Sequence, residues 1–324
     1  VRWNVPQHAA AEAGRGPPGT LGAGDAVGPR WKGCKDCCHD GNKPAPCLDV
    51  EACAASAPHS GKYAFVLSHW QTPRRTGFLP NIQAMRSHAQ LHGMDILMLM
   101  RKGDIPRMPR AVRQELDDFG VRLVPVDWDL PPGMVFHPYD WYEGKTAGWC
   151  GPMDLMRLHI FGLEGYDAVV YYDSDVEIQG DVTPMLRCAA TGKLLTTSGT
   201  MSPINVAFIA ARPDPRMLRA AAEFARAANF SKPAGWGREG YAPAGSKYIG
   251  AECGQGFMHT LYYKAGTSEV ARRSLARAGL RPEEVGAAQV DRCVWNYHGT
   301  ESCGMSPRAF DCSLVRVHHK PKKP

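Results

Sequence analysis

The sequence predicts an α/β fold, a single Rossmann-like domain whose central sheet is mixed but mostly parallel and is flanked by helices. From Lys62 onward, short apolar runs of strand length alternate with segments of helical spacing. Each run is continuous rather than alternating, which is typical of strands buried on both faces. Residues 1–62 lack apolar periodicity and hold five of the eleven cysteines. We therefore predict a Gly/Pro/Cys-rich stem or linker at 1–62 and a folded α/β domain at 63–324.

The first half of the domain is predicted to alternate strands and helices regularly. Gly120 ends one helix, and Pro152 opens another because proline suits the first helical turn. The predicted strands are 63–68, 94–100, 121–126 and 168–172, and the predicted helices are 78–91, 111–119 and 151–161.

The second half is less regular, and its elements are separated by longer connections. The segment 230–250 is rich in Gly, Pro and aromatic residues, and loops of this length are often functional lids. The predicted strands are 193–197, 205–211, 293–297 and 314–318, and the predicted helices are 215–228, 255–263 and 268–278.

Composition excludes several classes of protein. The 324 residues are 44% hydrophobic and 22% charged, which is ordinary for a globular chain. The net charge of +6 is small and dispersed, so we expect no nucleic-acid partner. No apolar run approaches the roughly 18 residues that span a bilayer. Because the chain begins at Val1, we expect membrane attachment only through an N-terminal anchor missing from this sequence.

Cysteine usage predicts an oxidising compartment. Clustered cysteines in a Gly/Pro-rich segment favour disulfides, and a zinc knuckle is the alternative, with Cys34, Cys37, Cys38, His39 and Cys47 as its ligands. The odd total leaves at least one thiol free or paired with another chain. The sequon at 229–231 is compatible with a glycoprotein. We expect a type II protein of the Golgi or ER lumen, or a secreted one.

An acidic pair follows the predicted strand 168–172. Asp173 and Asp175 are two residues apart, so in an extended chain they point to the same side. A buried parallel strand delivers such residues to the edge where α/β sheets bind ligands. Two close carboxylates repel unless a cation lies between them, and oxygen ligands favour Mg²⁺ or Mn²⁺. A second pair within 127–129 precedes two prolines and is interpreted as a loop.

The sequence around this acidic pair and beyond it resembles glycosyltransferase family 8, which includes glycogenin and bacterial lipopolysaccharide galactosyltransferases and has the GT-A fold. The resemblance covers roughly residues 62–321, and its motifs occur in family order. They are Met156-Arg157-Leu158-His159, Tyr166 to Val176, Asn205 to Ile209, Gly254 to Thr260, and a shortened terminal motif from Val317 to Pro321.

The resemblance implies a metal-dependent, retaining glycosyltransferase that moves a sugar from a UDP-sugar to a saccharide, glycan or glycoprotein acceptor. Mn²⁺, or Mg²⁺, would be held by Asp173, Asp175 and His318, with His319 as the alternative to His318. The implied catalytic residues are Arg157, Asp173 and Gln255. The implied donor-binding residues are Leu67, Ser68, Arg157, Asp173, Ser174, Asp175, Asn205, Gln255 and Lys320.

The sequence departs from the family pattern in two places. Gly254 replaces the Asp that precedes Gln255, and the terminal motif lacks its usual spacer and Trp. These departures support an alternative, a catalytically silent lumenal carbohydrate-binding or scaffold protein. A metal-dependent phosphohydrolase is a third hypothesis. Four large aromatic residues are candidates either for stacking on sugar rings or for packing, namely Trp128, Trp141, Tyr142 and Trp236.

Overall fold

The computed structural model describes most of the predicted domain and part of the segment before it. The described residues are 38–40, 43–45, 47–69, 79–127, 152–173, 176–199, 202–228, 230–231, 235–237, 250–251, 253–298 and 315–319.

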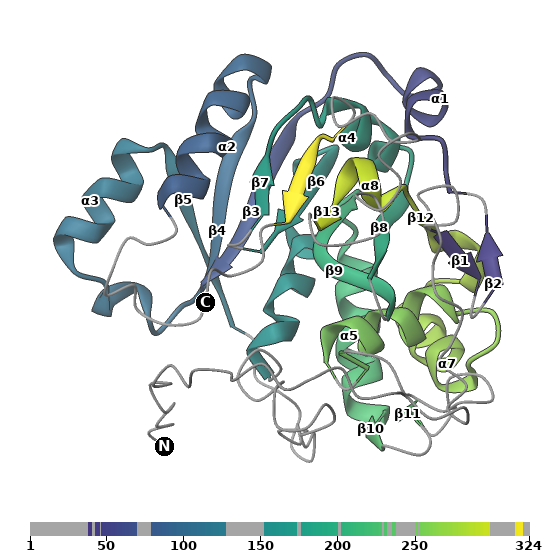
Figure 1. The fold of residues 1–324 in the computed structure, drawn as a ribbon. Coiled ribbons are helices and arrows are strands. Elements are labelled where there is room, and N and C mark those ends of the chain that lie inside the picture. Colours follow the sequence, from purple (N-terminus) through teal and green to yellow (C-terminus); the bar gives the residue numbers. More distant parts are fainter. Residues whose placement is uncertain are drawn as a thin grey trace, which may run out of the picture.

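A seven-stranded sheet forms the centre of the molecule, in the order β12-β8-β9-β6-β3-β4-β5 (Figure 1). A three-stranded sheet, β13-β14-β7, stands beside it. The strands are β1 Cys38–Asp40, β2 Lys43–Ala45, β3 Tyr63–His69, β4 Asp95–Arg101, β5 Val121–Val126, β6 Ala168–Tyr172, β7 Val176–Ile178, β8 Lys193–Gly199, β9 Ser202–Ala211, β10 Phe230–Ser231, β11 Gly235–Trp236, β12 Gly286–Gln289, β13 Tyr297–His298 and β14 Val317–His319.

The large sheet is mixed and mostly parallel, which confirms the predicted fold class. Strands β6, β3, β4 and β5 are parallel neighbours, and so are β12 and β8. Strand β9 is antiparallel to both β6 and β8. The four parallel neighbours start together, since Tyr63 pairs with Ala168 and Ala64 with Asp95. Their carboxyl ends therefore meet at one edge, where a ligand site is expected.

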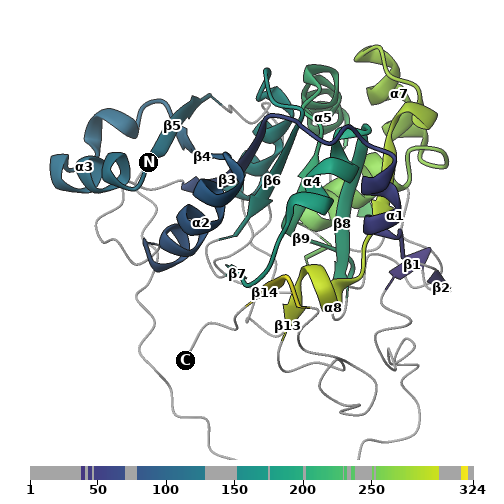
Figure 2. The ribbon, with the colours of Figure 1, turned by 90° about the horizontal axis from the view of Figure 1, so that it is seen from above.

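Helices cover both faces of the sheet (Figure 2). The α-helices are α1 Val50–Ala55, α2 Leu79–His92, α3 Arg110–Asp118, α4 Thr183–Ala190, α5 Pro215–Ala227, α6 Gly254–Met258, α7 Glu269–Arg277 and α8 Arg292–Trp295. The 3₁₀ helices are η2 Ile105–Arg107, η3 Pro152–Gly162 and η5 Pro282–Glu284, and His259–Tyr263 forms a π-helix, η4. Among the described helices, none is long and apolar enough to cross a membrane.

The sheet separates two hydrophobic cores. Side chains of α2, α3 and α4 pack on one face, where Phe65 and Tyr172 are fully buried. Side chains of η3, α5, α6 and α7 pack on the other face, where Tyr171 points. Tyr171 and Tyr172 face opposite cores because successive strand residues alternate. This alternation decides which way Asp173, the next residue, can point.

One predicted strand is wrong, and several elements were not predicted. Residues 293–297 were expected to be a strand, but Arg292–Trp295 form helix α8, and only Tyr297 belongs to β13. The reason is the preceding residue, because Asp291 caps the helix by accepting a hydrogen bond from the Cys293 N–H (2.8 Å). Helices α1 and α4 and strands β7 and β12 are additional elements that apolar periodicity did not reveal.

A disulfide attaches α1 to the main body. Cys53 of α1 is bonded to Cys188 of α4, which lies 135 residues further along the chain. Val50 and Ala54 of the same helix are buried. Cys47, Cys253 and Cys293 are also disulfide-bonded. Of the five clustered cysteines, Cys47 and Cys53 are thus disulfide-bonded, which confirms the disulfide prediction for these two, and Cys47 is also one of the proposed zinc ligands.

Candidate functional site

Asp173 is the first residue after β6, at the carboxyl edge of the parallel strands. Its N–H donates to the carbonyl of Ala207 in β9 (2.9 Å), so the antiparallel neighbour fixes the backbone at this point. The side chain is one-third exposed. Asp173 therefore lies directly after the strand, as predicted. The other two residues of the acidic motif, Ser174 and Asp175, lie outside the described residues.

A hydrogen-bonded chain joins Asp173 to strand β3. Tyr171 donates from its hydroxyl to Asp173 Oδ1 (3.0 Å), and the Ser68 hydroxyl lies 2.8 Å from the Tyr171 oxygen. Tyr171 and Asp173 can meet because residues i and i+2 of a strand share a side. Burial, with Asp173 as a second cause, raises the pKa of Tyr171 above its ordinary value, so its hydroxyl remains a donor.

Arg157, on η3, is buried beneath this edge, with 7% of its surface exposed. Its Nη1 lies 3.5 Å from Asp173 Oδ1 and also donates to the Val206 carbonyl. Its Nε donates to the Asp154 carbonyl (2.8 Å), and its Nη2 pairs with the Asp154 carboxylate. Its guanidinium stacks over the Tyr171 ring, 5.1 Å from the centroid. Arg157 thus links η3, β6 and β9.

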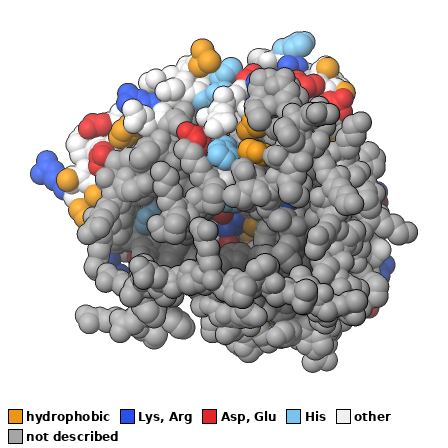
Figure 3. All heavy atoms as spheres, in the orientation of Figure 1, with side chains coloured by type: hydrophobic (Ala, Val, Ile, Leu, Met, Phe, Trp, Pro, Cys, Tyr) orange, Lys and Arg blue, Asp and Glu red, His pale blue; other side chains and the backbone are white. Residues whose placement is uncertain are grey.

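The charge on Arg157 is retained despite burial. Desolvation by burial lowers the pKa of the guanidinium, but the attraction of Asp154 and then of Asp173 for the positive charge is stronger, so the pKa is raised overall. The three groups form a compact acid–base–acid cluster. At the centre of the face in Figure 3, acidic and basic side chains are visible at depth. The positive charge of Arg157 can therefore hold the Asp173 carboxylate in a fixed orientation at the sheet edge.

Asp154 also contacts the start of α6. The N–H of Gly254 donates to Asp154 Oδ2, and a Cβ added at position 254 would lie 2.5 Å from that oxygen. Gly254 is the position at which the sequence departs from the pattern that it resembles. The carboxylate of Asp154 therefore occupies the space into which a side chain at position 254 would project. The acidic side chain beside position 254 therefore belongs to Asp154 of η3 and not to a residue of α6.

Gln255 is buried with 8% of its surface exposed, and its amide lies against Gly250. A Cβ at Gly250 would overlap the Gln255 side chain, and the φ of +77° at Gly250 also favours glycine. The neighbouring Gly254 connects Gln255 to Asp154 and thereby to Arg157. The structure therefore brings together two of the sequence motifs, the one around Arg157 and the one around Gln255.

Asn205 and Leu67, two predicted donor-binding residues, have different surroundings. Asn205 Oδ1 accepts from the Ala207 N–H (2.9 Å), and the intervening Val206 carbonyl accepts from Arg157. The side chain of Leu67 is buried in the α2-side core, so Leu67 can offer a ligand only its backbone.

The terminal motif lies beside the acidic segment. Strand β14 is antiparallel to β7, with His318 opposite Glu177 and His319 opposite Val176, the residue after Asp175. The His318 ring lies 5.6 Å from that of Tyr297, and His319 Nδ1 is 3.1 Å from Asn296 Oδ1. This register agrees with the predicted proximity of both motifs. Lys320 lies outside the described residues.

Among the aromatic candidates, Trp236 is a packing residue. It is 2% exposed, packs at a tilt against Phe224 and edge-on against Phe257, and donates its indole N–H to the Ala251 carbonyl (2.9 Å). Outside the described residues lie Trp128, Trp141, Tyr142 and the sequon residue Asn229.

Sequence reasoning missed Asp154 and Tyr171. Asp154 lies three residues before Arg157, a spacing at which helical side chains meet, and Tyr171 lies two residues before Asp173. Within the described ranges, a group of three side chains that could hold a metal ion lies elsewhere. It consists of His88, His92 and Asp181, and it is not part of the predicted Asp173, Asp175 and His318 set.

Comparison with known proteins returned only structural likenesses. No protein-family model matches the chain, and neither does any curated protein. The solved galactosyltransferase LgtC, in complex with donor and acceptor sugar analogues, aligns at 12% identity with a TM-score of 0.41, covering 81% of this chain and 87% of LgtC. GlyE, a glycosyltransferase of Streptococcus pneumoniae TIGR4, aligns at 12% identity and TM-score 0.37, covering 80% of this chain and 54% of GlyE.

A third likeness is to a glycosyltransferase involved in glycosylating the major capsid of PBCV-1. It aligns at 11% identity and TM-score 0.37, covering 80% of this chain and 93% of that one. With TM-scores below 0.5, these likenesses do not establish a family for the chain. The functional argument therefore rests on its own residues.

Proposed function

We propose that this protein is a glycosyltransferase of the GT-A type that moves a sugar from a UDP-sugar to a saccharide or protein acceptor. The observation that carries the proposal is the position of Asp173, at the carboxyl edge of β6 and beside the buried Arg157 (3.5 Å). An acid fixed at the edge of a parallel sheet is suited to hold a cation that binds a diphosphate. The order of the other sequence motifs along the chain also supports a glycosyltransferase.

In this proposal Asp173, Asp175 and His318 hold Mn²⁺ or Mg²⁺. When bound, the metal supplies Lewis-acid stabilisation of the charge on the departing diphosphate. Each of the three guanidinium nitrogens of Arg157 contacts a protein oxygen, which supports a further role in positioning Asp173. Gln255 would place its amide near the anomeric carbon. Retention of configuration would follow if the acceptor attacks on the face from which the diphosphate leaves.

The test is a panel of nucleotide sugars assayed for Mn²⁺-dependent turnover. We expect activity with a UDP-sugar and a loss of about 100-fold or more in Asp173→Asn, because the neutral amide cannot offset the metal's charge. Asp117→Asn is the matched control at an exposed acid on α3, and it should retain activity. Nuclear magnetic resonance of the product should show the donor's anomeric configuration. Equal turnover by Asp173→Asn and wild type would reject the proposed role of Asp173.

The second candidate is a catalytically silent carbohydrate-binding or scaffold protein. The observation that favours it is Gly254, where the resembling family has Asp. The contact between Asp154 and Gly254 favours the transferase instead, since it places a carboxylate beside position 254. Glycan binding without hydrolysis or transfer of any UDP-sugar, in the same panel, would favour this second candidate.

We also propose a lumenal or secreted location, supported by the bonded cysteines. Mass spectrometry of the non-reduced protein from its native source should recover a cross-linked peptide containing Cys53 and Cys188. Loss of this one bond in Cys53→Ala should lower the free energy of unfolding by about 2–5 kcal/mol, because the bond closes a long loop in the unfolded chain. Reduction of the wild type should lower it at least as much, since reduction also breaks the bonds of Cys47, Cys253 and Cys293. Recovery of both cysteines as free thiols would contradict the proposal.

A further inference from the structure

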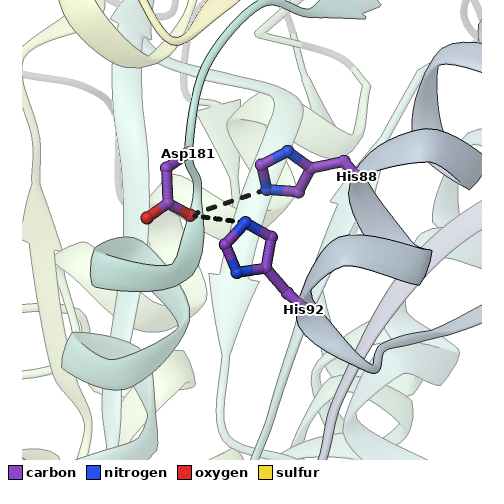
Figure 4. A group of neighbouring side chains, drawn as sticks. All are labelled: His88, His92 and Asp181. Atoms are coloured by element: carbon purple, nitrogen blue, oxygen red, sulfur yellow. Dashed lines mark ion pairs between the residues drawn. The ribbon is translucent and has the colours of Figure 1, made fainter.

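A cluster of three metal-ligating side chains lies between α2 and α4. His88 and His92 are one turn apart on α2, and both point toward Asp181 in the segment before α4 (Figure 4). The potential ligand atoms all lie within 4.8 Å of one another. None of the three residues has a role in the proposed transfer reaction.

The cluster is separated from Asp173 by the central sheet. The His88 ring packs edge-on against Phe65, which belongs to the α2-side core. Tyr171, which hydrogen-bonds Asp173, belongs to the core on the opposite face. In addition, α2 leads from His92 into the start of β4, whereas Asp173 follows the end of β6. A metal at this cluster would therefore be distinct from one at the acidic motif.

The distances suit a single tetrahedral ion. Asp181 Oδ1 lies 3.6 Å from His88 Nε2 and 3.5 Å from His92 Nε2. Two ligands bound to one tetrahedral Zn²⁺ at about 2.05 Å stand roughly 3.3 Å apart. Small rotamer adjustments would thus bring the three atoms to coordination distance. The His88 and His92 rings, 4.5 Å apart, already stand side by side.

Neighbouring groups orient the ligands. The Thr183 hydroxyl lies 3.2 Å from His92 Nδ1, leaving Nε2 to face Asp181, and the Thr183 N–H donates to Asp181 Oδ1 (2.8 Å). A partner on the ring nitrogen that faces away from the ion, as Thr183 is for His92, is typical of metal sites. The competing Val182 N–H reaches His88 Nε2 only at 3.4 Å, a long hydrogen bond that an ion would replace.

Exposure permits entry of an ion. The side chains of His88 and His92 are 12% and 24% exposed, whereas that of Asp181 is 44% exposed. The imidazoles are thus held against the protein, and the carboxylate faces solvent. Three protein ligands leave a fourth tetrahedral position for water. Two imidazoles with one carboxylate favour Zn²⁺, Co²⁺ or Ni²⁺, whereas Mg²⁺ and Mn²⁺ prefer oxygen ligands.

We propose that His88, His92 and Asp181 form a binding site for a divalent ion of the zinc class, which fastens α2 to the segment before α4. The site requires neither a nucleotide sugar nor the acidic motif. Its occupancy can therefore be measured whether or not the proposed transferase activity exists.

The test is titration of the metal-stripped, non-reduced full chain with Co²⁺, followed by visible absorption. We expect d–d bands of a tetrahedral site that saturate at one ion per chain, are displaced by Zn²⁺, and are accompanied by a raised melting temperature. His92→Gln should abolish the band, and Thr183→Val should weaken binding by about 10-fold. His59→Gln is the matched control at an exposed histidine, and Asp173→Asn should also keep the band.

Three outcomes would overturn the proposal. The first is the absence of a stoichiometric band in the wild-type chain, which does not depend on any variant folding. The second is an unchanged band in both His92→Gln and His88→Gln. The third is a sulfur-to-cobalt charge-transfer band that survives both substitutions, since it would assign the ion to cysteines. Circular dichroism of the metal-free variants should match that of the metal-free wild type.

Discussion

Replacing Arg157 with alanine is expected to destabilise the protein by about 3–5 kcal/mol and to abolish sugar transfer. The guanidinium is buried between the carboxylates of Asp154 and Asp173, and Val206 contributes a carbonyl. Removing it leaves the buried Asp154 carboxylate without its cation, at a large desolvation cost. Asp173 would lose the contact that orients it. Urea unfolding and Mn²⁺-dependent turnover measure the two effects.

The matched control is Arg216→Ala. Arg216 also pairs with two acids, Asp214 (2.8 Å) and Glu284 (3.4 Å), but its side chain is 43% exposed. Solvent screens exposed pairs, so this substitution should cost no more than about 1 kcal/mol. Arg157→Lys should fall between the two arginine-to-alanine variants, since it keeps the charge but loses the planar fork. Equal stability of Arg157→Ala and Arg216→Ala would show that the buried cluster contributes no more than a surface pair.

The substitution Gly256→Ala should be the most damaging glycine-to-alanine change in the Gly254–Gln255–Gly256 stretch. A Cβ at Gly256 would overlap the carbonyl group of Ala251, and backbone cannot move aside as a side chain can. We expect a loss of about 3 kcal/mol or more, with displacement of Gln255. The urea midpoint at an unchanged slope reports the change in stability.

The substitution Gly254→Ala should show a different balance of effects. Its Cβ would meet the Asp154 carboxylate, which can rotate away at a cost of about 1–3 kcal/mol but would then release Arg157. We therefore expect activity to fall more than stability does. Gly103→Ala and Gly266→Ala are the controls, because no heavy atom lies within 4 Å of either added Cβ. A Gly256→Ala variant as stable as these controls would contradict the close packing of α6.

The sequence alone placed the main strands and the position of Asp173 at the end of one of them. The apolar run 168–172 is continuous because β6 is covered on both faces, so a strand ending immediately before Asp173 could be predicted. The parallel arrangement of β3, β4 and β5 followed from the helices between them. Helix α8 escaped prediction because capping by Asp291, rather than the apolar residues that follow, decided the local structure.

Only the tertiary structure decided which groups meet at the sheet edge. Apolar periodicity reports that a residue is buried, but it does not identify the partner of a buried polar group. The resemblance placed Arg157 among the donor-binding residues, and the structure adds that its guanidinium contacts Asp154, Val206 and Asp173. The contact between Asp154 and Gly254 joins residues a hundred positions apart. Such long-range pairings depend on how η3 and α6 pack, which no local pattern in the sequence encodes.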